Sequence, residues 1–155
     1  MPDTPSLHIA LVNPQIGPNT GNIGRLCLGI GARLHLVHPL GFSLDEKQVR
    51  RAGLDYWKHV DLQEHADLAA FLQWLEGRRF FLYSTKGEGT YARLAHERGD
   101  VLVFGQESKG LPADLIAAHG AWRIPMPGPV RSLNLSNSVS VVSMHALRGV
   151  QPELF

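Results

Sequence analysis

Short apolar runs alternate with helical patterns along this chain, and the alternation restricts the folds that it can adopt. The apolar runs predict strands over Leu7–Val12, Leu34–Val37, Arg79–Ser84, Val101–Phe104 and Trp122–Met126. The helical patterns cover Thr20–Gly29, Lys47–Ala52, Asp67–Leu75, Pro112–Ala118 and Val139–Arg148. This order predicts an α/β fold, with a mostly parallel sheet that has helices on both faces. Ligands of such sheets bind at the carboxyl ends of the strands. In this chain, loops rich in Gly, Pro and Asn follow the predicted strands at these ends.

Length and composition predict a single domain over residues 1–155, because no repeat, linker or low-complexity segment interrupts the sequence. No apolar run approaches the roughly 18 residues of a membrane span, and the N-terminus lacks the pattern of a secretion signal. The single cysteine, Cys27, fits a reducing compartment, so we expect a cytoplasmic location. A net charge of +1 argues against a strongly basic surface but allows a local basic patch.

Several common cofactor and metal sites lack their motifs in this chain. No G-x-G-x-x-G sequence follows the first predicted strand, no Walker A sequence is present, and Gly29-Ile-Gly31 has the position of a helix C-cap. The segment Gly105–Gly110 has the wrong spacing for a nucleophile elbow. The eight histidines are scattered singly without cysteine partners, so we expect no metal site.

An unusually polar run, Arg131–Val139, leads into the last apolar helix. Ser136 or Asn137 can act as the N-cap, but one cap needs one such residue, and this run contains two Asn and three Ser. A surplus amide or hydroxyl that is buried without a partner costs about 1–3 kcal/mol. The run therefore indicates a loop that folds around itself or around a ligand, and the alternative is a helix cap with excess polar residues.

Three polar loops follow predicted strands: Pro14–Arg25, Phe104–Pro112 and Ile124–Asn137. In this order they resemble the three motifs of the SpoU-type branch of the SPOUT RNA 2′-O-methyltransferases. The similarity is greatest to the short members that are tRNA (cytidine/uridine-34-2′-O)-methyltransferases. It covers almost the whole chain and includes Arg50–Tyr56 and Thr85–Gly87 between the main motifs.

The resemblance implies an α/β-knot fold with a C-terminal trefoil knot, a homodimer, and no separate RNA-binding extension. It also implies that S-adenosylmethionine is the cofactor and that tRNA is the substrate. Carried over by motif, the cofactor contacts are Tyr83, Gly105, Ile124 and Ser132. A glycine allows the close approach of a ligand, and an isoleucine can form an apolar wall. The alternative for Tyr83 and Ile124 is that both side chains simply end core strands.

The implied reaction is methyl transfer to the ribose 2′-hydroxyl of the wobble nucleotide, position 34. The resemblance makes Arg25 the catalytic residue and brings it from the partner subunit. Because arginine stays protonated, we expect Arg25 to bind phosphate and to stabilise the developing alkoxide rather than act as a base. Its alternative role is that of an ordinary surface arginine. Asn19 and Asn22 could hold the loop or bind RNA, whereas Glu107 and Asn137 are expected to brace the knot.

A small basic group next to two aromatic residues is the candidate RNA-binding surface. Its members are Lys47, Arg50, Arg51 and Lys58, with Tyr56 and Trp57 beside them. Aromatic rings and guanidinium planes can stack on the unpaired bases of an anticodon loop. The alternative is a solvated helix face with core aromatics. Arg131 is the stronger candidate for a phosphate contact, because it lies in the third motif.

The last helix predicts an obligate dimer independently of the resemblance. Its apolar residues leave little polar surface, so we expect it to be covered on both sides. The small residues Ser140, Ser143 and Ala146 recur every three positions and would let a partner's helix approach. Met144 departs from the tyrosine that close relatives often carry. Two alternative functions remain, a methyltransferase acting on ribosomal RNA and a non-catalytic module that binds adenosine or RNA.

Overall fold

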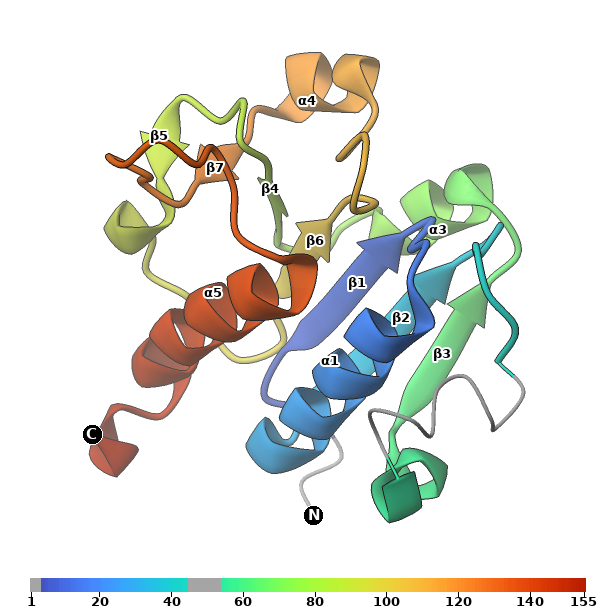
Figure 1. Ribbon diagram of the computed structural model, residues 1–155. Coiled ribbons are helices and arrows are strands. Elements are labelled where there is room, and N and C mark those ends of the chain that lie inside the picture. The colour runs from blue at the N-terminus through green and yellow to red at the C-terminus, as the bar shows by residue number, and fades with distance from the viewer. Residues whose placement is uncertain (1–3, 45–53) are drawn as a thin grey trace.

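Seven parallel strands form one sheet in the order β3-β2-β1-β6-β4-β7-β5 (Figure 1). This architecture is that of a computed structural model, which describes residues 4–44 and 54–155. The strands are β1 (His8–Val12), β2 (Arg33–Val37), β3 (Leu62–His65), β4 (Phe80–Tyr83), β5 (Gly89–Thr90), β6 (Val101–Phe104) and β7 (Trp122–Arg123). Every pairing between these strands is parallel, which confirms the predicted sheet type.

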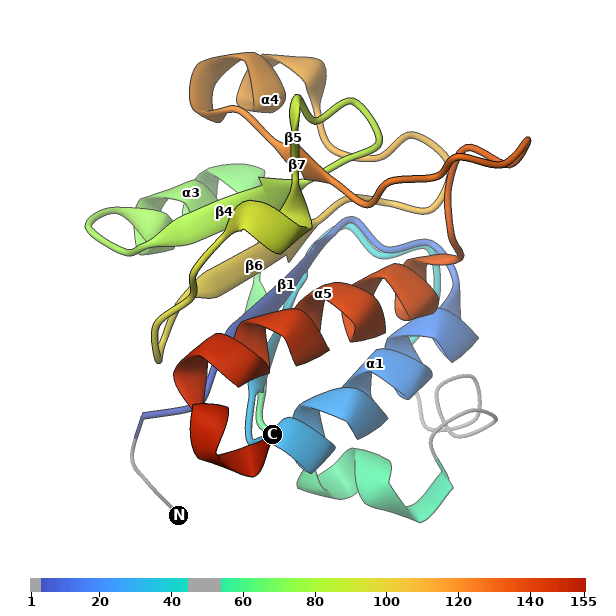
Figure 2. The ribbon, with the colours of Figure 1, turned by 90° about the vertical axis from the view of Figure 1, so that its left-hand side faces the viewer.

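Helices cover both faces of the sheet, as predicted (Figures 1 and 2). They are α1 (Gly17–Ile30), α3 (Leu68–Leu75), α4 (Ala113–His119) and α5 (Leu135–Val150), with short 3-10 helices η1 (Leu54–His59), η2 (Tyr91–Arg93) and η3 (Pro152–Leu154). On one face α1 and α5 lie side by side and bury Ile23 and Val142 in the larger core. On the other face α3 and α4 bury Phe71 and Leu115 in a second core. The α/β fold with two covered faces is thus confirmed.

Two helices begin at other residues than predicted, because residues outside the apolar pattern decide where they start. Helix α1 begins at Gly17, since Pro18 suits the first turn of a helix and draws part of the predicted loop into it. Helix α5 begins at Leu135, and the expected caps Ser136 and Asn137 lie inside its first turn. The N-cap is Asn134, whose side-chain oxygen accepts a 2.9 Å hydrogen bond from the Ser136 backbone N–H. The predicted C-cap at Gly31 is confirmed by its positive φ of 70°.

The strands on the outer parts of the sheet were the hardest to predict. The last strand covers only Trp122–Arg123 instead of the expected five residues, so Ile124 lies beyond it. The sequence did not predict β3, because only His65 of its four residues is buried and no apolar run marks it. The basic turn expected over Lys47–Ala52 lies outside the described residues.

Three histidines lie together, which corrects the expectation that all of them are scattered singly. His8, His35 and His65 come from neighbouring strands and are buried beneath Trp74. His8 Nδ1 is 2.8 Å from His35 Nε2, and His35 Nδ1 is 2.9 Å from His65 Nε2. These residues are far apart in sequence, and only the parallel pairing of their strands brings them together. No local sequence pattern reveals this. Within residues 4–44 and 54–155, no group of three or more His, Cys, Asp or Glu side chains could hold a metal ion.

Helix α5 packs differently from the prediction. Its small residues Ser143 and Ala146 are completely buried, and the helix that packs beside α5 is α1 of the same chain. The expected contact with a partner's helix is therefore not what explains this spacing. Val141 and Met144 do remain exposed, by 37% and 40%.

Candidate active site at the carboxyl ends of the strands

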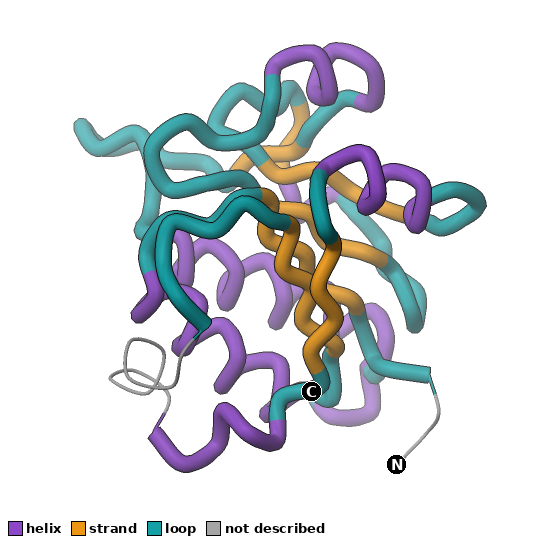
Figure 3. Tube along the Cα trace, turned by 90° about the vertical axis from the view of Figure 1, so that its right-hand side faces the viewer, coloured by secondary structure: helices purple, strands orange, loops and turns teal. Residues whose placement is uncertain are grey.

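The three polar loops of the sequence motifs follow β1, β6 and β7, whose carboxyl ends lie at the same edge of the parallel sheet. Figure 1 shows these loops at the end of the sheet to which the strand arrows point, opposite the C-terminus. The tube in Figure 3 shows the same loops from the side. This edge is where ligands of open α/β sheets bind.

Glu107 joins the first two loops. Its carboxylate accepts hydrogen bonds from the backbone N–H groups of Gln15 and Ile16, both at 2.8 Å, and from the Asn19 amide at 3.2 Å. Gln15 reciprocates, because its side-chain oxygen accepts from the Ser108 backbone at 2.9 Å and from the Ser108 hydroxyl at 2.7 Å. The N-cap residue of α1, Ile16, makes no side-chain cap bond. A carboxylate from a distant loop thus stabilises the positive end of this helix.

Asn19 and Asn134 extend these contacts to the third loop. Asn134 Nδ2 donates to Asn19 Oδ1 at 3.2 Å, and Asn134 Oδ1 accepts from the Ser136 hydroxyl at 2.6 Å. The Ser140 hydroxyl in turn donates to the Ser136 carbonyl at 2.9 Å. We call Gln15, Asn19, Glu107 and Asn134 the loop clasp. Part of the polar run therefore folds around itself, and Asn19 holds the loop, one of its two expected roles.

Tyr83 lies among the strand ends of the predicted cofactor site. Its Cα is paired with Phe104 of β6 and with Trp122 of β7. The side chain is only 6% exposed, stacks on Phe104 with ring centroids 5.1 Å apart, and places its hydroxyl 3.0 Å from His96 Nε2. The Tyr83 side chain is therefore a core group, as its alternative interpretation held, and only its backbone lies at the edge of the sheet.

The other three predicted cofactor contacts lie in different surroundings. A Cβ atom at Gly105 would overlap the backbone of Gly110 and Leu111, so the second loop itself requires this glycine. Ile124 is half-buried against the larger core, and Ser132 is exposed. The close packing of the second loop therefore explains why residue 105 is a glycine, and the sequence did not indicate this reason.

Arg25 and Asn22 are exposed and lie one turn apart on α1. The Arg25 guanidinium is 5.7 Å from the centroid of the Tyr56 ring, a distance at which a cation–π interaction is effective. Neither residue belongs to the loop clasp, unlike the buried Asn19 on the same helix.

The candidate RNA-binding residues fall into three groups. Arg50 and Arg51 lie outside the described residues, as does Lys47. Arg131 is exposed in the third loop, and Lys58 is exposed on η1. Trp57 packs against the larger core, where a Cβ on Gly24 would lie 2.6 Å from its ring. For Trp57 the alternative interpretation, a core aromatic, is therefore the correct one.

Sequence reasoning missed Gln15 and Asn134 as members of the site, and it missed the hydroxyl contact of Tyr83. Asn134 belongs to the polar run, so its residue type was a usable signal. Gln15 carries no such signal, because a single glutamine in a loop is compatible with a solvated side chain.

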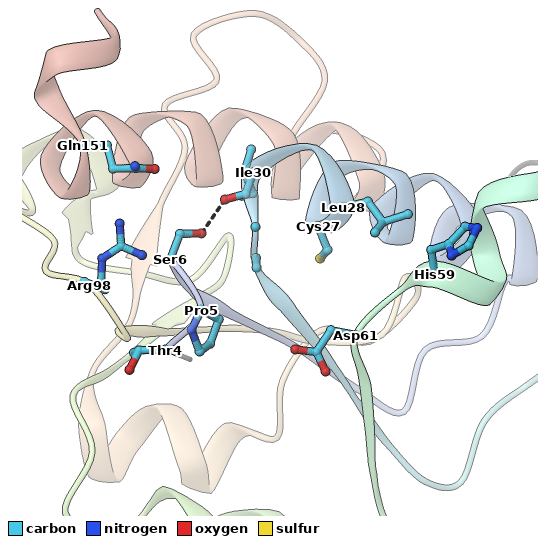
Figure 4. Close-up of a pocket in the computed structure, with 12 residues that line it drawn as sticks. Thr4, Pro5, Ser6, Cys27, Leu28, Ile30, His59, Asp61, Arg98 and Gln151 are labelled. Carbon is cyan, nitrogen blue, oxygen red and sulfur yellow. Dashed lines mark hydrogen bonds between the residues drawn. The ribbon is translucent and has the colours of Figure 1, made fainter. Parts of the chain in front are cut away.

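Two cavities of about 290 Å³ each lie near the sheet. One is lined by Gln15 and Gln106 beside the loop clasp. The other, shown in Figure 4, lies at the amino ends of β1, β2 and β3 and is lined by Ser6, Cys27 and Asp61 among others. In this second cavity the Ser6 hydroxyl donates to the Ile30 carbonyl at 2.6 Å. Neither cavity is lined by Tyr83, Ile124 or Ser132.

A model of the SpoU rRNA Methylase family matches residues 6–144. The chain belongs to this SpoU methylase family. A tRNA (cytidine(34)-2′-O)-methyltransferase of Methylovorus glucosotrophus is 48% identical over 143 residues, which cover 90% of this chain and 93% of the relative. One of Escherichia coli K12 is 47% identical over 145 residues, which cover 92% of each chain.

Solved structures agree with membership of the SpoU methylase family. One, described as giving structural insights into the 2-OH methylation of C/U34 on tRNA, is 47% identical with a TM-score of 0.89. It covers 92% of this chain, which in turn covers 95% of it. The SpoU methyltransferase AviRb of Streptomyces viridochromogenes, in complex with AdoMet, is 21% identical with a TM-score of 0.80, over 94% of this chain and 58% of AviRb. AviRb therefore shares the fold. In the part of the chain that the structure describes, no helix is long and apolar enough to cross a membrane.

Proposed function

We propose that this protein transfers a methyl group from S-adenosylmethionine to the ribose 2′-hydroxyl of nucleotide 34, a cytidine or uridine, in tRNA. The observation that carries this proposal is the 47% identity, over 92% of both chains, to a tRNA (cytidine(34)-2′-O)-methyltransferase. The loop clasp supports it, because it joins the three motif loops at the edge of the sheet where ligands bind.

The proposed cofactor site lies over the adjacent ends of β4, β6 and β7. Backbone groups at Tyr83, Gly105 and Ile124 would hold the adenosine part, with the half-buried Ile124 side chain as an apolar wall and the Ser132 hydroxyl as a donor. This site fits the cofactor, because the backbone N–H and C=O groups at the ends of closely spaced strands offer both hydrogen-bond donors and acceptors. When bound, S-adenosylmethionine supplies an electrophilic methyl group on its sulfonium sulfur.

In the proposed reaction the ribose 2′-oxygen forms a bond to the methyl carbon while the carbon–sulfur bond breaks. The hydroxyl proton leaves to solvent, and S-adenosylhomocysteine is the second product. Arg25 stabilises the developing alkoxide and binds a neighbouring phosphate, because its planar guanidinium presents several donors and stays charged. Arg25 is exposed, which suits a residue that acts on a molecule outside its own subunit. Orienting the two reactants can supply about 7–11 kcal/mol of the barrier reduction.

A homodimer completes the proposed site, with Arg25 of one subunit at the cofactor of the other. Val141 and Met144 support this arrangement, because both are exposed on α5 beside the residues buried against α1. Arg131 is the proposed phosphate contact, and Asn22, Arg50 and Arg51 are further proposed RNA contacts. The C-terminal trefoil knot and the cytoplasmic location stay predictions.

The proposal is tested by incubating the purified protein with S-adenosylmethionine carrying a labelled methyl group and, in parallel reactions, with total tRNA or with ribosomal RNA. Digestion and mass spectrometry should place the label on the ribose of nucleotide 34, and Arg25→Ala is the matched control. Label in ribosomal RNA alone would favour the first alternative function. Cofactor binding without transfer to any RNA would favour a non-catalytic module. Absence of binding at millimolar S-adenosylmethionine would refute the methyltransferase function altogether.

A further inference from the structure

A buried row of hydrogen bonds leads from Tyr83 to the surface. The Tyr83 hydroxyl is 3.0 Å from His96 Nε2, and His96 Nδ1 is 3.0 Å from Asp100 Oδ2. The other Asp100 oxygen accepts a hydrogen bond of 2.8 Å from Arg79 Nε. Tyr83, His96 and Asp100 are 6%, 5% and 1% exposed, so water does not compete for these bonds. We call Tyr83, His96, Asp100 and Arg79 the tyrosine relay.

The chemistry of Asp100 sets the direction of these hydrogen bonds. Burial opposes ionisation of Asp100, but hydrogen bonds from Arg79, the Glu97 N–H and His96 outweigh it and hold its pKa below the ordinary value. An ionised carboxylate only accepts, so the His96 proton is on Nδ1, and Nε2 accepts from Tyr83. Burial, together with the nearby Asp100 carboxylate, raises the pKa of Tyr83 and keeps its hydroxyl a donor.

The segment that carries His96 is itself held in place by helix α5. His145 on α5 donates from Nε2 to the Leu94 carbonyl at 3.0 Å. A Cβ atom on Gly149 would lie 3.0 Å from the His96 carbonyl oxygen, so the two backbones are in close contact. Because α5 holds its segment, His96 keeps its position, and it would not move along with Tyr83 if the tyrosine shifted.

The anchored residue lies in the middle of the proposed cofactor site. Tyr83 ends β4, and the neighbouring strands reach Gly105 one residue after its partner Phe104 and Ile124 two residues after its partner Trp122. The Ser84 N–H also donates to the Trp122 carbonyl at 2.9 Å. A shift of Tyr83 along its strand would therefore change the spacing of all three strand ends.

We propose that His96 and Asp100 are positioning residues for cofactor binding, which hold the end of β4 in place through the Tyr83 hydroxyl. The proposal rests on the function proposed above. The hydroxyl is buried and bonded within the protein, so it touches neither the ribose nor the methyl group. Its loss acts only through the position of the backbone, and the affinity for S-adenosylmethionine is the quantity that changes.

The test compares Tyr83→Phe with Tyr91→Phe, which removes a hydroxyl from a half-buried ring outside the relay. Isothermal titration with S-adenosylmethionine is carried out well below the unfolding midpoint of each variant, with the folded fraction checked by circular dichroism. We expect Tyr83→Phe to raise the Kd about five- to tenfold, the effect of about one hydrogen bond. The Kd of Tyr91→Phe should equal that of the wild type. In the methyl-transfer assay, the KM for S-adenosylmethionine of Tyr83→Phe should rise in step with its Kd.

A second pair of variants separates positioning from simple stabilisation. His96→Gln keeps an acceptor near the place of Nε2 and should retain most of the affinity, whereas His96→Leu should lose as much as Tyr83→Phe. A lower midpoint of unfolding with an unchanged Kd in Tyr83→Phe would overturn the positioning role. A fall in kcat at saturation with an unchanged Kd would overturn it as well. If the wild type itself does not bind S-adenosylmethionine, the proposed function fails instead, which the same titration reveals.

Discussion

Replacing the Glu107 carboxylate should loosen the first two motif loops directly, because this side chain accepts two backbone N–H groups and the Asn19 amide. The third loop should follow, because Asn134 donates to the same Asn19 side chain. Glu107→Gln keeps the shape but puts an NH2 group where at least one of these donors points. Hydrogen bonds to a charged group contribute about 1.5–3 kcal/mol, and a negative charge at a helix N-terminus about 0.3–1 kcal/mol. Since the amide oxygen keeps part of these contacts, we expect the free energy of unfolding to fall by about 2 kcal/mol.

Urea unfolding at one fixed protein concentration measures this loss. With an m-value of about 2 kcal/mol/M, the midpoint should move down by about 1 M while m stays constant. Glu88→Gln is the matched control, because Glu88 is exposed, and its effect should stay below about 0.5 kcal/mol. An unchanged midpoint for Glu107→Gln would refute the stabilising role of the loop clasp. A change in m alone would show instead that the compactness of the native or of the unfolded state had changed.

Three further outcomes are expected. Arg25→Ala should reduce kcat about 100-fold, about 3 kcal/mol, with little change in cofactor Kd by titration, and Arg25→Lys should recover little because a point charge cannot replace the guanidinium plane. Burial, with His8, His65, Arg33 and Arg78 adding in that order, lowers the pKa of His35 to about 2, and burial with the two arginines lowers that of His8 to about 4. The unfolded chain therefore binds more protons below about pH 6.5, so chemical denaturation should show full stability above that pH and a progressive loss toward pH 4; a flat profile would contradict the buried, neutral histidines. Met144→Asp should give folded monomers by light scattering, whereas Ser143→Arg should unfold the protein, because Ser143 is completely buried within one chain.

Local patterns were sufficient where a residue's neighbours in sequence decide its conformation. Strand β6 was predicted with its observed ends because a run of four apolar residues is too short for a helix and suits a strand that is buried on both faces. Helix α3 begins where Asp67 accepts the Ala70 N–H, and α1 ends where Gly31 adopts a positive φ. Caps of this kind act over three or four residues, so the sequence shows them directly.

Strand β3 shows where local patterns fail. Three of its four residues are not buried, and it is a strand because β2 offers a free edge for parallel pairing. The short β7 is similar, since it pairs with β4 at Tyr83 alone and with β5 over two residues. Apolar periodicity reports burial on a face, and such outer strands have little of it.

The sequence by itself determined the fold class, the three motif loops and the family to which the chain belongs, because these depend on residue types and on their order. Only the tertiary structure decided which side chains meet. Glu107 reaches Gln15 across 92 residues of sequence, and His8 reaches His35 across 27. It also decided that the Tyr83 side chain points into the core and leaves only its backbone at the site. Parallel pairing brings distant strand ends to one edge of the sheet, and a one-residue change of register would send each side chain to the opposite face.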